Sequence, residues 1–128
     1  MKVDALDHFV LTCADMDASV RFYTGVLGME LVIFGESRKA LRFGDTKINL
    51  HQQGKEFEPK AQQALPGSAD LCFVTSVPID QVIEHLNQCE VSIIYGPVEQ
   101  TGAISQLRSV YFRDPDQNLI EVANKVAS

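Results

Sequence analysis

Cysteine is scarce in this chain, and its few thiols are not arranged for a metal or disulfide framework. The 128 residues include three cysteines, an odd number with no CxxC spacing. A disulfide-stapled fold or a thiolate zinc site is therefore not expected, and a reducing cytoplasm is the expected compartment. Low-complexity tracts are also missing, and a composition of 45% hydrophobic and 22% charged residues is ordinary for a globular protein.

Positive charge is in short supply, and so are long apolar segments. The formal net charge is −6, which argues against nucleic acid or an anionic membrane surface as a partner. No apolar run approaches membrane-spanning length. The first residues, MKVDALDHFVLT, are interrupted by Asp4, Asp7 and His8, so they lack the apolar core of a signal peptide. We expect a soluble, cytoplasmic protein.

An internal repeat is what the chain does contain. Its first half predicts a strand, a helix that begins after Asp15 and ends near Gly28, and three more strands. Its second half predicts the same order. The predicted strands of the two halves are 5–12, 29–34, 38–43 and 46–52, then 69–76, 91–95, 105–112 and 118–123, with the second helix at 78–88. Residues 54–68 contain two prolines and resemble a connector.

The two halves also match in detail. LDHFVLT aligns with ADLCFVT, and FGDTKINLH aligns with FRDPDQNLIE if one extra turn residue is allowed. This predicts an α+β fold of two βαβββ modules, 3–53 and 69–125, within one domain spanning 1–128. Each module is too small to bury a core alone, so the two should pack together or exchange partners in a dimer.

Strand alternation places three metal-ligand residue types on one side of these strands. If the apolar sides carry the helices, His8, His51 and Glu121 all fall on the opposite face, each on a different strand. On a fully solvated face they are ordinary surface residues. If the sheets curl, two imidazoles and a carboxylate converge, a set that suits Fe, Mn, Ni, Co or Zn ions. Three protein ligands leave coordination positions open for substrate.

The opening and closing segments resemble a known family. DHFVLTCADMDASVRFYTGVLGMEL is similar to the start of vicinal oxygen chelate superfamily proteins, and YFRDPDQNLIEV is similar to their closing signature. The superfamily includes glyoxalase I, fosfomycin-inactivating thiol transferases, extradiol dioxygenases and bleomycin-binding proteins. The resemblance covers roughly residues 3 to 125, and the connector further resembles a glyoxalase-domain-containing subgroup.

The resemblance implies sheets curled into a cup with one divalent metal ion at its base. His8, His51 and Glu121 match ligand positions, whereas the fourth ligand of four-ligand glyoxalases falls at Leu71. Glyoxalase I usually has a glutamate where this chain has His51. These departures argue against strict lactoylglutathione lyase activity.

Four functions remain open on this resemblance. The first is a lactoylglutathione-lyase-like lyase or isomerase that acts on a small α-oxo compound or its thiol adduct, with glutathione as a candidate co-substrate. In it the metal chelates substrate oxygens and stabilises an enediolate, and Glu121 or metal-bound hydroxide is the base. The alternatives are an extradiol-type dioxygenase, a fosfomycin-type thiol transferase and a non-enzymatic binding protein.

A few further residues carry weaker predictions. Tyr111 lies ten residues before Glu121, where the dioxygenases place an active-site tyrosine, and it could equally be a cup-lining aromatic. Arg42, Lys47 and Asn49 share the inferred side of the ligands and could hold an anionic substrate or form a solvated rim. The resemblance also implies a homodimer in which at least one metal ligand comes from the second copy.

Overall fold

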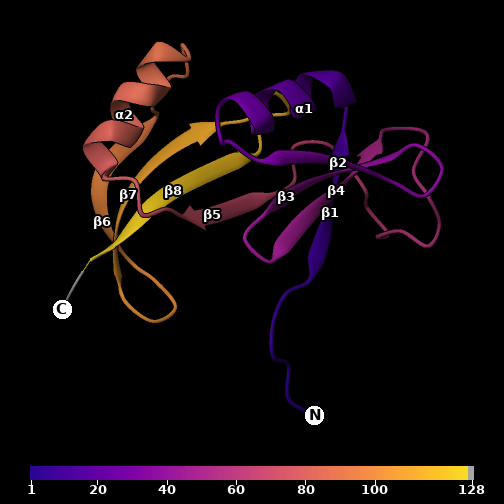
Figure 1. The fold of residues 1–128 in the computed structure, drawn as a ribbon, viewed down its shortest axis with the longest axis horizontal. Helices are drawn as coiled ribbons and strands as arrows, with labels where there is room; N and C mark the ends of the chain where they lie inside the picture. The colour runs from indigo at the N-terminus through magenta and orange to yellow at the C-terminus, as the bar shows by residue number, and fades with distance from the viewer. Residues whose placement is uncertain (127–128) are drawn as a thin grey trace. The chain divides into compact units, whose positions relative to one another are not determined.

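The computed structural model describes residues 1–126, and the chain divides into two compact units, Met1–Pro66 and Gly67–Ser128. Each unit consists of a strand, a helix and three further strands (Figure 1). The prediction of an α+β fold with two βαβββ modules is therefore confirmed. Among the described residues, no helix is long and apolar enough to cross a membrane.

The first unit is one mixed four-stranded sheet with a single helix. Its elements are β1 (His8–Cys13), α1 (Met16–Gly25), β2 (Glu30–Phe34), β3 (Arg38–Phe43) and β4 (Thr46–Gln52). The strand order is β1-β4-β3-β2, with β1 parallel to β4 and the other pairs antiparallel. Helix α1 begins where the Asp15 side chain accepts a hydrogen bond from the Ala18 N–H, which satisfies one of the helix's free amide donors.

The second unit repeats this plan with different turns. Its elements are β5 (Asp70–Val74), α2 (Ile79–Gln88), β6 (Tyr95–Thr101), β7 (Gln106–Arg113) and β8 (Leu119–Val126). The order β5-β8-β7-β6 matches the order of the first sheet, and β5 is parallel to β8. Helix α2 begins after Pro78, whose side chain has no hydrogen-bond acceptor to cap the helix. Instead, the Asn124 side chain on β8 accepts a hydrogen bond from the Ile79 N–H.

In each unit, one face of the sheet is buried beneath the helix. Helix α1 packs on β2, β3 and β4, and helix α2 packs on β7. Tyr23 of α1 and Ile48 of β4 are fully buried in the first unit, as are Phe112 of β7 and Ile120 of β8 in the second. Because alternate strand residues point to opposite faces, the polar residues between these core positions lie on the sheet face away from the helix.

One predicted helix end is confirmed, and one predicted strand was misplaced. Helix α1 ends at Gly25, close to the predicted Gly28, which lies in the following turn with a φ of 67°. The strand predicted at 91–95 is β6, which begins only at Tyr95. β6 accommodates Gly96 and Pro97, because proline is tolerated on an edge strand, where no inward ladder bond is lost. β6 is the outer strand of its sheet and carries a register shift at this point.

Candidate metal centre

In each unit, we call the sheet face away from the helix the open face. On the first sheet it carries the residues that strand alternation predicted there. Parallel pairing sets His8 beside Lys47, Val10 beside Asn49, and Thr12 beside His51. Paired residues of neighbouring strands project from the same face of a sheet. The prediction that His8 and His51 share a face is therefore confirmed.

His8 has the surroundings of a metal ligand that is held in one orientation. Its side chain is about half exposed, and its Nδ1 lies 2.8 Å from the Asp7 carboxylate. A carboxylate on one ring nitrogen fixes the tautomer of a metal-binding histidine and directs the other nitrogen toward the ion. Asp7 orients His8 in this way and leaves Nε2 available. Asp7 belongs to no motif in the sequence that would have predicted this contact.

The register also separates His8 from His51 along the strands. His8 pairs with Lys47, four residues before His51 on β4, which places them roughly 13 Å apart at about 3.3 Å per residue. Metal–nitrogen bonds are only about 2 Å long, so imidazoles this far apart on one sheet do not meet on a single ion. A single copy of the chain therefore does not bring both imidazoles onto one ion. That His8 and His51 are ligands of the same ion stays a prediction, in which a second copy supplies one of them.

His51 is buried, and its nearby charges are of both signs: the Arg38 and Lys60 cations and the Glu56 carboxylate. It is 3% exposed, and neither ring nitrogen has a hydrogen-bond partner among the described residues. The ring of Phe57 meets it edge-on, with centroids 5.5 Å apart. Burial lowers the pKa of His51, and the nearby Arg38 guanidinium lowers it further. The ring is thus neutral at neutral pH, with one donor and one acceptor nitrogen.

In the second unit, Glu121 is the centre of a polar cluster on the open face of the sheet. Its strand neighbours are Cys72 on β5 and Tyr111 on β7. The Ser109 hydroxyl donates a 2.6 Å hydrogen bond to Glu121 Oε2. This leaves Oε1 free of the Ser109 bond, and the hydrogen bond restricts rotation of the carboxylate.

Two neighbours of Glu121 are held in their protonated forms. Partial burial raises the pKa of the Cys72 thiol to about 11, and the charge of the Glu121 carboxylate adds to the shift. Burial also raises the pKa of Tyr111 to about 12, with a hydrogen bond to Glu121 as the second cause. At neutral pH both groups are hydrogen-bond donors rather than bases. Sequence reasoning missed Cys72 and Ser109, because only the strand register reveals them.

The strand register corrects the alignment of the two halves. Leu71 pairs with Ile120 on the helix-covered side, so the position that corresponds to a fourth ligand is not Leu71. The hairpin pairs Arg42–Lys47 and Arg113–Leu119 lie on the open faces.

We treat these two hairpin pairs as equivalent positions of the two units. Counting along the paired strands from them then relates the first strand of one unit to that of the other, and likewise the last strands. The resulting equivalent positions are His8 with Asp70, Asn49 with Glu121, and His51 with Ala123. Glu121 is therefore the counterpart of Asn49 and not of His51.

The three predicted substrate-binding residues differ in their surroundings. Arg42 is already paired with Glu30 at 2.7 Å, whereas the Lys47 ammonium lies 3.8 Å from the centre of the Phe34 ring. The side-chain oxygen of Asn49 is buried without a partner among the described residues. Arg38, four residues before Arg42 on β3, shares this face. The same alternation that identified Arg42 could have identified it.

The donor set fits a divalent ion in part. Within residues 1–126, no three His, Cys, Asp or Glu side chains come close enough to hold an ion together. His8 and Glu121 each have the donor chemistry and the orienting hydrogen bond of a metal ligand. Each residue belongs to its own unit, and the assignment of both as ligands stays a prediction.

Comparison with known proteins identifies relatives over almost the whole chain. The family model described as the Glyoxalase/Bleomycin resistance protein/Dioxygenase superfamily matches residues 5–122. Virulence protein STM3117 of Salmonella typhimurium is 55% identical over 98% of this chain and 88% of its own length. Its crystal structure matches 98% of this chain and 100% of that chain with a TM-score of 0.97.

Two further relatives extend this comparison. Glyoxalase domain-containing protein RDO1 of Mycosarcoma maydis is 53% identical over 97% of this chain and 70% of its own length. The structure of a lactoylglutathione lyase from Agrobacterium tumefaciens shares the fold, with a TM-score of 0.73 and 22% identity over 97% of this chain and 96% of that one.

Proposed function

Because the chain belongs to the Glyoxalase/Bleomycin resistance protein/Dioxygenase superfamily, we propose that it is a divalent-metal-dependent, glyoxalase-like lyase or isomerase. Its substrate is a small α-oxo compound or the thiol adduct of one. The observation that carries the proposal is the Glu121 cluster, in which a carboxylate on the open sheet face contacts three protonated side chains. A carboxylate with this support can both hold an ion and move a proton.

His8 and Glu121 are the proposed ligands from this chain. When bound, the ion supplies an electrophile that binds two adjacent substrate oxygens and stabilises the charge that develops on them. Asp7 keeps the His8 ring in the orientation that presents Nε2. The remaining protein ligand is expected from a second copy of the chain, as the family resemblance implies. His51 then serves this site only if that copy presents it.

Glu121 is the proposed base because its neighbours cannot take its place. Tyr111 and Cys72, with pKa values near 12 and 11, stay protonated at neutral pH. Removing a proton next to a carbonyl requires a base whose pKa lies near the working pH or below it. Tyr111 and Ser109 instead donate hydrogen bonds to Glu121, which hold the carboxylate in place.

An extradiol-type dioxygenase is the second candidate, and Tyr111 is the residue that favours it. Its phenol contacts the proposed metal ligand Glu121 and faces the same side of the sheet. Because this contact serves a lyase equally well, turnover has to decide between the two functions.

The test compares substrates and metals on one purified protein. Its metal content is measured first. Turnover of a methylglyoxal–glutathione hemithioacetal is then compared with turnover of catechols, with Ni(II), Co(II), Zn(II), Mn(II) and Fe(II) each supplied. Hemithioacetal or α-oxo turnover with several of these ions supports the proposal. Catechol ring opening with Fe(II) alone would assign the protein to the dioxygenases instead.

A sedimentation experiment tests the proposed contribution of a second copy. The protein is expected to sediment as a homodimer and to bind one ion per copy. A monomer that binds the ion tightly would show that one chain supplies every protein ligand.

A further inference from the structure

Three side chains on β3 and β4 form a second polar cluster on the first sheet, away from His8. They are Arg38, Asn49 and His51. Asn49 and His51 are 7% and 3% exposed, and they lie two residues apart on the same side of β4. The Asn49 oxygen and both His51 ring nitrogens lack a hydrogen-bond partner within the part of the chain that the structure describes. Buried polar atoms nearly always have a partner, so these three atoms point to a bound molecule.

Arg38 adds an uncompensated positive charge to the cluster. Its guanidinium lies 5.0 Å from the centre of the Phe34 ring and 4.4 Å from that of Phe57. Across residues 1–126 it makes no ion pair with a carboxylate. Arg42, on the same strand, is already paired with Glu30. Arginine held against aromatic rings keeps its planar donor fork in one orientation, which suits two-point binding of a carboxylate.

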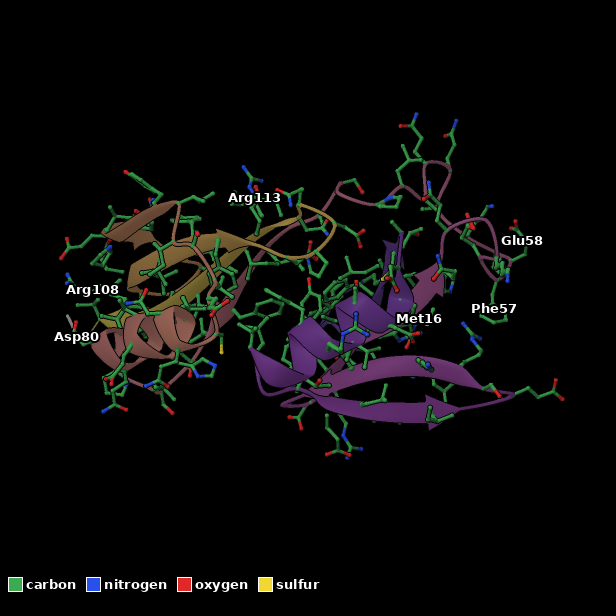
Figure 2. The ribbon with its side chains drawn as sticks, turned by 90° about the horizontal axis from the view of Figure 1, so that it is seen from above. Met16, Phe57, Glu58, Asp80, Arg108 and Arg113 are labelled. Carbon is green, nitrogen blue, oxygen red and sulfur yellow. The ribbon has the colours of Figure 1, made fainter. Side chains whose placement is uncertain are left out.

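The connector contributes one wall of this cluster. Phe57 belongs to the segment after β4 and contacts both His51 and Arg38. Figure 2 shows Phe57 and Glu58 on this connector, beside the strands of the first unit. The charge of Lys60 on the same segment is already offset by Glu56 and Glu58. Arg38 therefore remains available to a ligand, as does Lys47, whose ammonium lies against the Phe34 ring that Arg38 also contacts.

The polar atoms without a hydrogen-bond partner, together with Arg38, indicate which chemical groups the ligand carries. An arginine without a partner requires an anion and disfavours a metal ion at this place. The Asn49 oxygen accepts hydrogen bonds only, so the ligand must also donate one. Neutral His51 offers one donor and one acceptor.

We infer that Arg38, Asn49 and His51 bind the carboxylate end of a small acid that carries an O–H or N–H donor on an atom close to the carboxylate. A 2-hydroxy acid and an N-acyl amino acid both have this pattern. The inference assigns His51 to substrate binding instead of metal binding. It rests on the proposed function for its role in catalysis. His8 lies roughly 13 Å away along the strands, so the cluster would hold a part of the substrate remote from the reacting oxygens.

Binding to the metal-free protein tests this inference directly. The full-length chain is treated with EDTA and titrated by calorimetry or NMR with lactate, N-acetylglycine, propionate, lactamide and inorganic phosphate. Lactate and N-acetylglycine should bind in the millimolar range or tighter. Propionate lacks the donor and lactamide lacks the charge, so each should bind about tenfold more weakly or worse. Equal binding of lactate, propionate and lactamide would overturn the inference, and so would binding of phosphate alone.

Two variants locate the site. Arg38→Met keeps an unbranched apolar stem and removes the guanidinium fork, so lactate affinity should fall about tenfold or more. Asn49→Leu should reduce lactate affinity to that of propionate and leave propionate binding unchanged. The matched control is Lys39→Met, because Lys39 is adjacent on β3 but pairs with Leu50 on the helix-covered side. Its lactate affinity should equal that of the wild type.

The outcomes separate this inference from the proposed function. Circular dichroism checks that each variant is folded, and if Arg38→Met is not, the ligand series on the wild-type protein decides alone. Normal lactate affinity in a folded Arg38→Met protein would reject the site even if hemithioacetal turnover is found. Conversely, Arg38-dependent lactate binding without any metal-dependent turnover would retain the site and reject only the proposed function.

Discussion

Asn49 in the first unit and Glu121 in the second occupy matching positions on the last strand of a βαβββ unit, yet their surroundings have opposite character. Asn49 lies near the uncompensated Arg38 and the neutral, buried His51. Glu121 is a carboxylate contacted by a hydroxyl, a phenol and a thiol. One strand register therefore carries the proposed anion-binding residues in one unit and the proposed proton-transfer residues in the other. A repeat preserves the positions of side chains while their functions diverge.

The largest expected effect is loss of turnover when the carboxylate of the second unit is removed. Glu121→Gln should lower kcat about 10²- to 10⁴-fold, the usual contribution of a general base. Steady-state kinetics with a saturating metal ion measure it. Glu99→Gln is the control. Glu99 lies on β6, beside β7, and pairs with Arg108, whose side chain projects from the opposite sheet face to that of Tyr111. Comparable losses in both variants would contradict a specific role for Glu121.

The hairpin turns of the two units should differ strongly in stability. Asp114 is buried, and its carboxylate accepts hydrogen bonds from the amides of Asp116 and Asn118 and from the Asn118 side chain. Asp114→Ala should lower the free energy of unfolding by about 2–4 kcal/mol, because it leaves buried donors unpaired.

The matched change in the first unit is Asp45→Ala in the exposed turn between β3 and β4. It should alter stability by less than about 0.5 kcal/mol. Urea denaturation of both variants measures the difference. Equal losses would show that the two turns contribute alike.

The thiol beside Glu121 should react slowly with alkylating reagents. The pKa of Cys72 is raised from 9.0 to about 11, so at pH 8 its thiolate fraction is about 100-fold lower than that of an ordinary thiol. The higher nucleophilicity of the more basic thiolate offsets part of this, which leaves a rate roughly tenfold lower. Glu121→Gln should increase the rate, since it removes the charge that opposes the thiolate. Mass spectrometry of iodoacetamide-treated protein measures both rates.

The raised pKa of Cys72 also predicts how the stability of the protein changes with pH. Because the folded-state pKa of Cys72 is above its ordinary value, the folded state binds the thiol proton more tightly. The contribution of Cys72 to stability is therefore fully present below pH 9 and is lost as the pH rises through about 11. A thiol that reacts at the unfolded rate in the folded protein would contradict the pKa shift.

The smallest effects concern how each unit caps its helix. Asp15→Ala removes the local cap of α1 and should cost about 1 kcal/mol. Asn124→Ala removes the acceptor for Ile79 together with two hydrogen bonds to the carbonyls of Thr75 and Val77. Its cost should be somewhat greater, about 1–2 kcal/mol. A smaller loss for Asn124→Ala than for Asp15→Ala, in thermal unfolding, would show that the cap on α2 is dispensable.

Local patterns in the sequence predicted most of the fold. Alternation and the Asp15 cap gave β1, α1 and the three strands after it to within a few residues. The same patterns placed β6 too early, because an edge strand accepts the Gly96-Pro97 pair that elsewhere ends a strand. Local signals specify an element but do not specify its position in the sheet.

The strand register agrees with the predicted faces, and the metal-ligand assignment stays a prediction. Alternation assigned His8, His51 and Asn49 to one side of the first sheet, and the register agrees. Periodicity does not give the offset between two strands, however. Both the separation of His8 from His51 and the replacement of Leu71 by Asp70 as the counterpart of His8 depend on that offset. The cross-strand contacts of Glu121 with Ser109 and Tyr111 required it as well.

The parallel pairing of the first and last strands has a consequence for how each unit folds. The hairpins β3–β4 and β7–β8 connect neighbours in sequence, whereas β1 joins β4 and β5 joins β8 across about 40 to 50 residues of intervening chain. Closing such a loop costs more chain entropy than closing a hairpin. We therefore expect β1 and β5 to dock last. Because β1 carries His8, a chain that has not completed this step would lack an assembled ion site, and metal affinity would report on the final stage of folding.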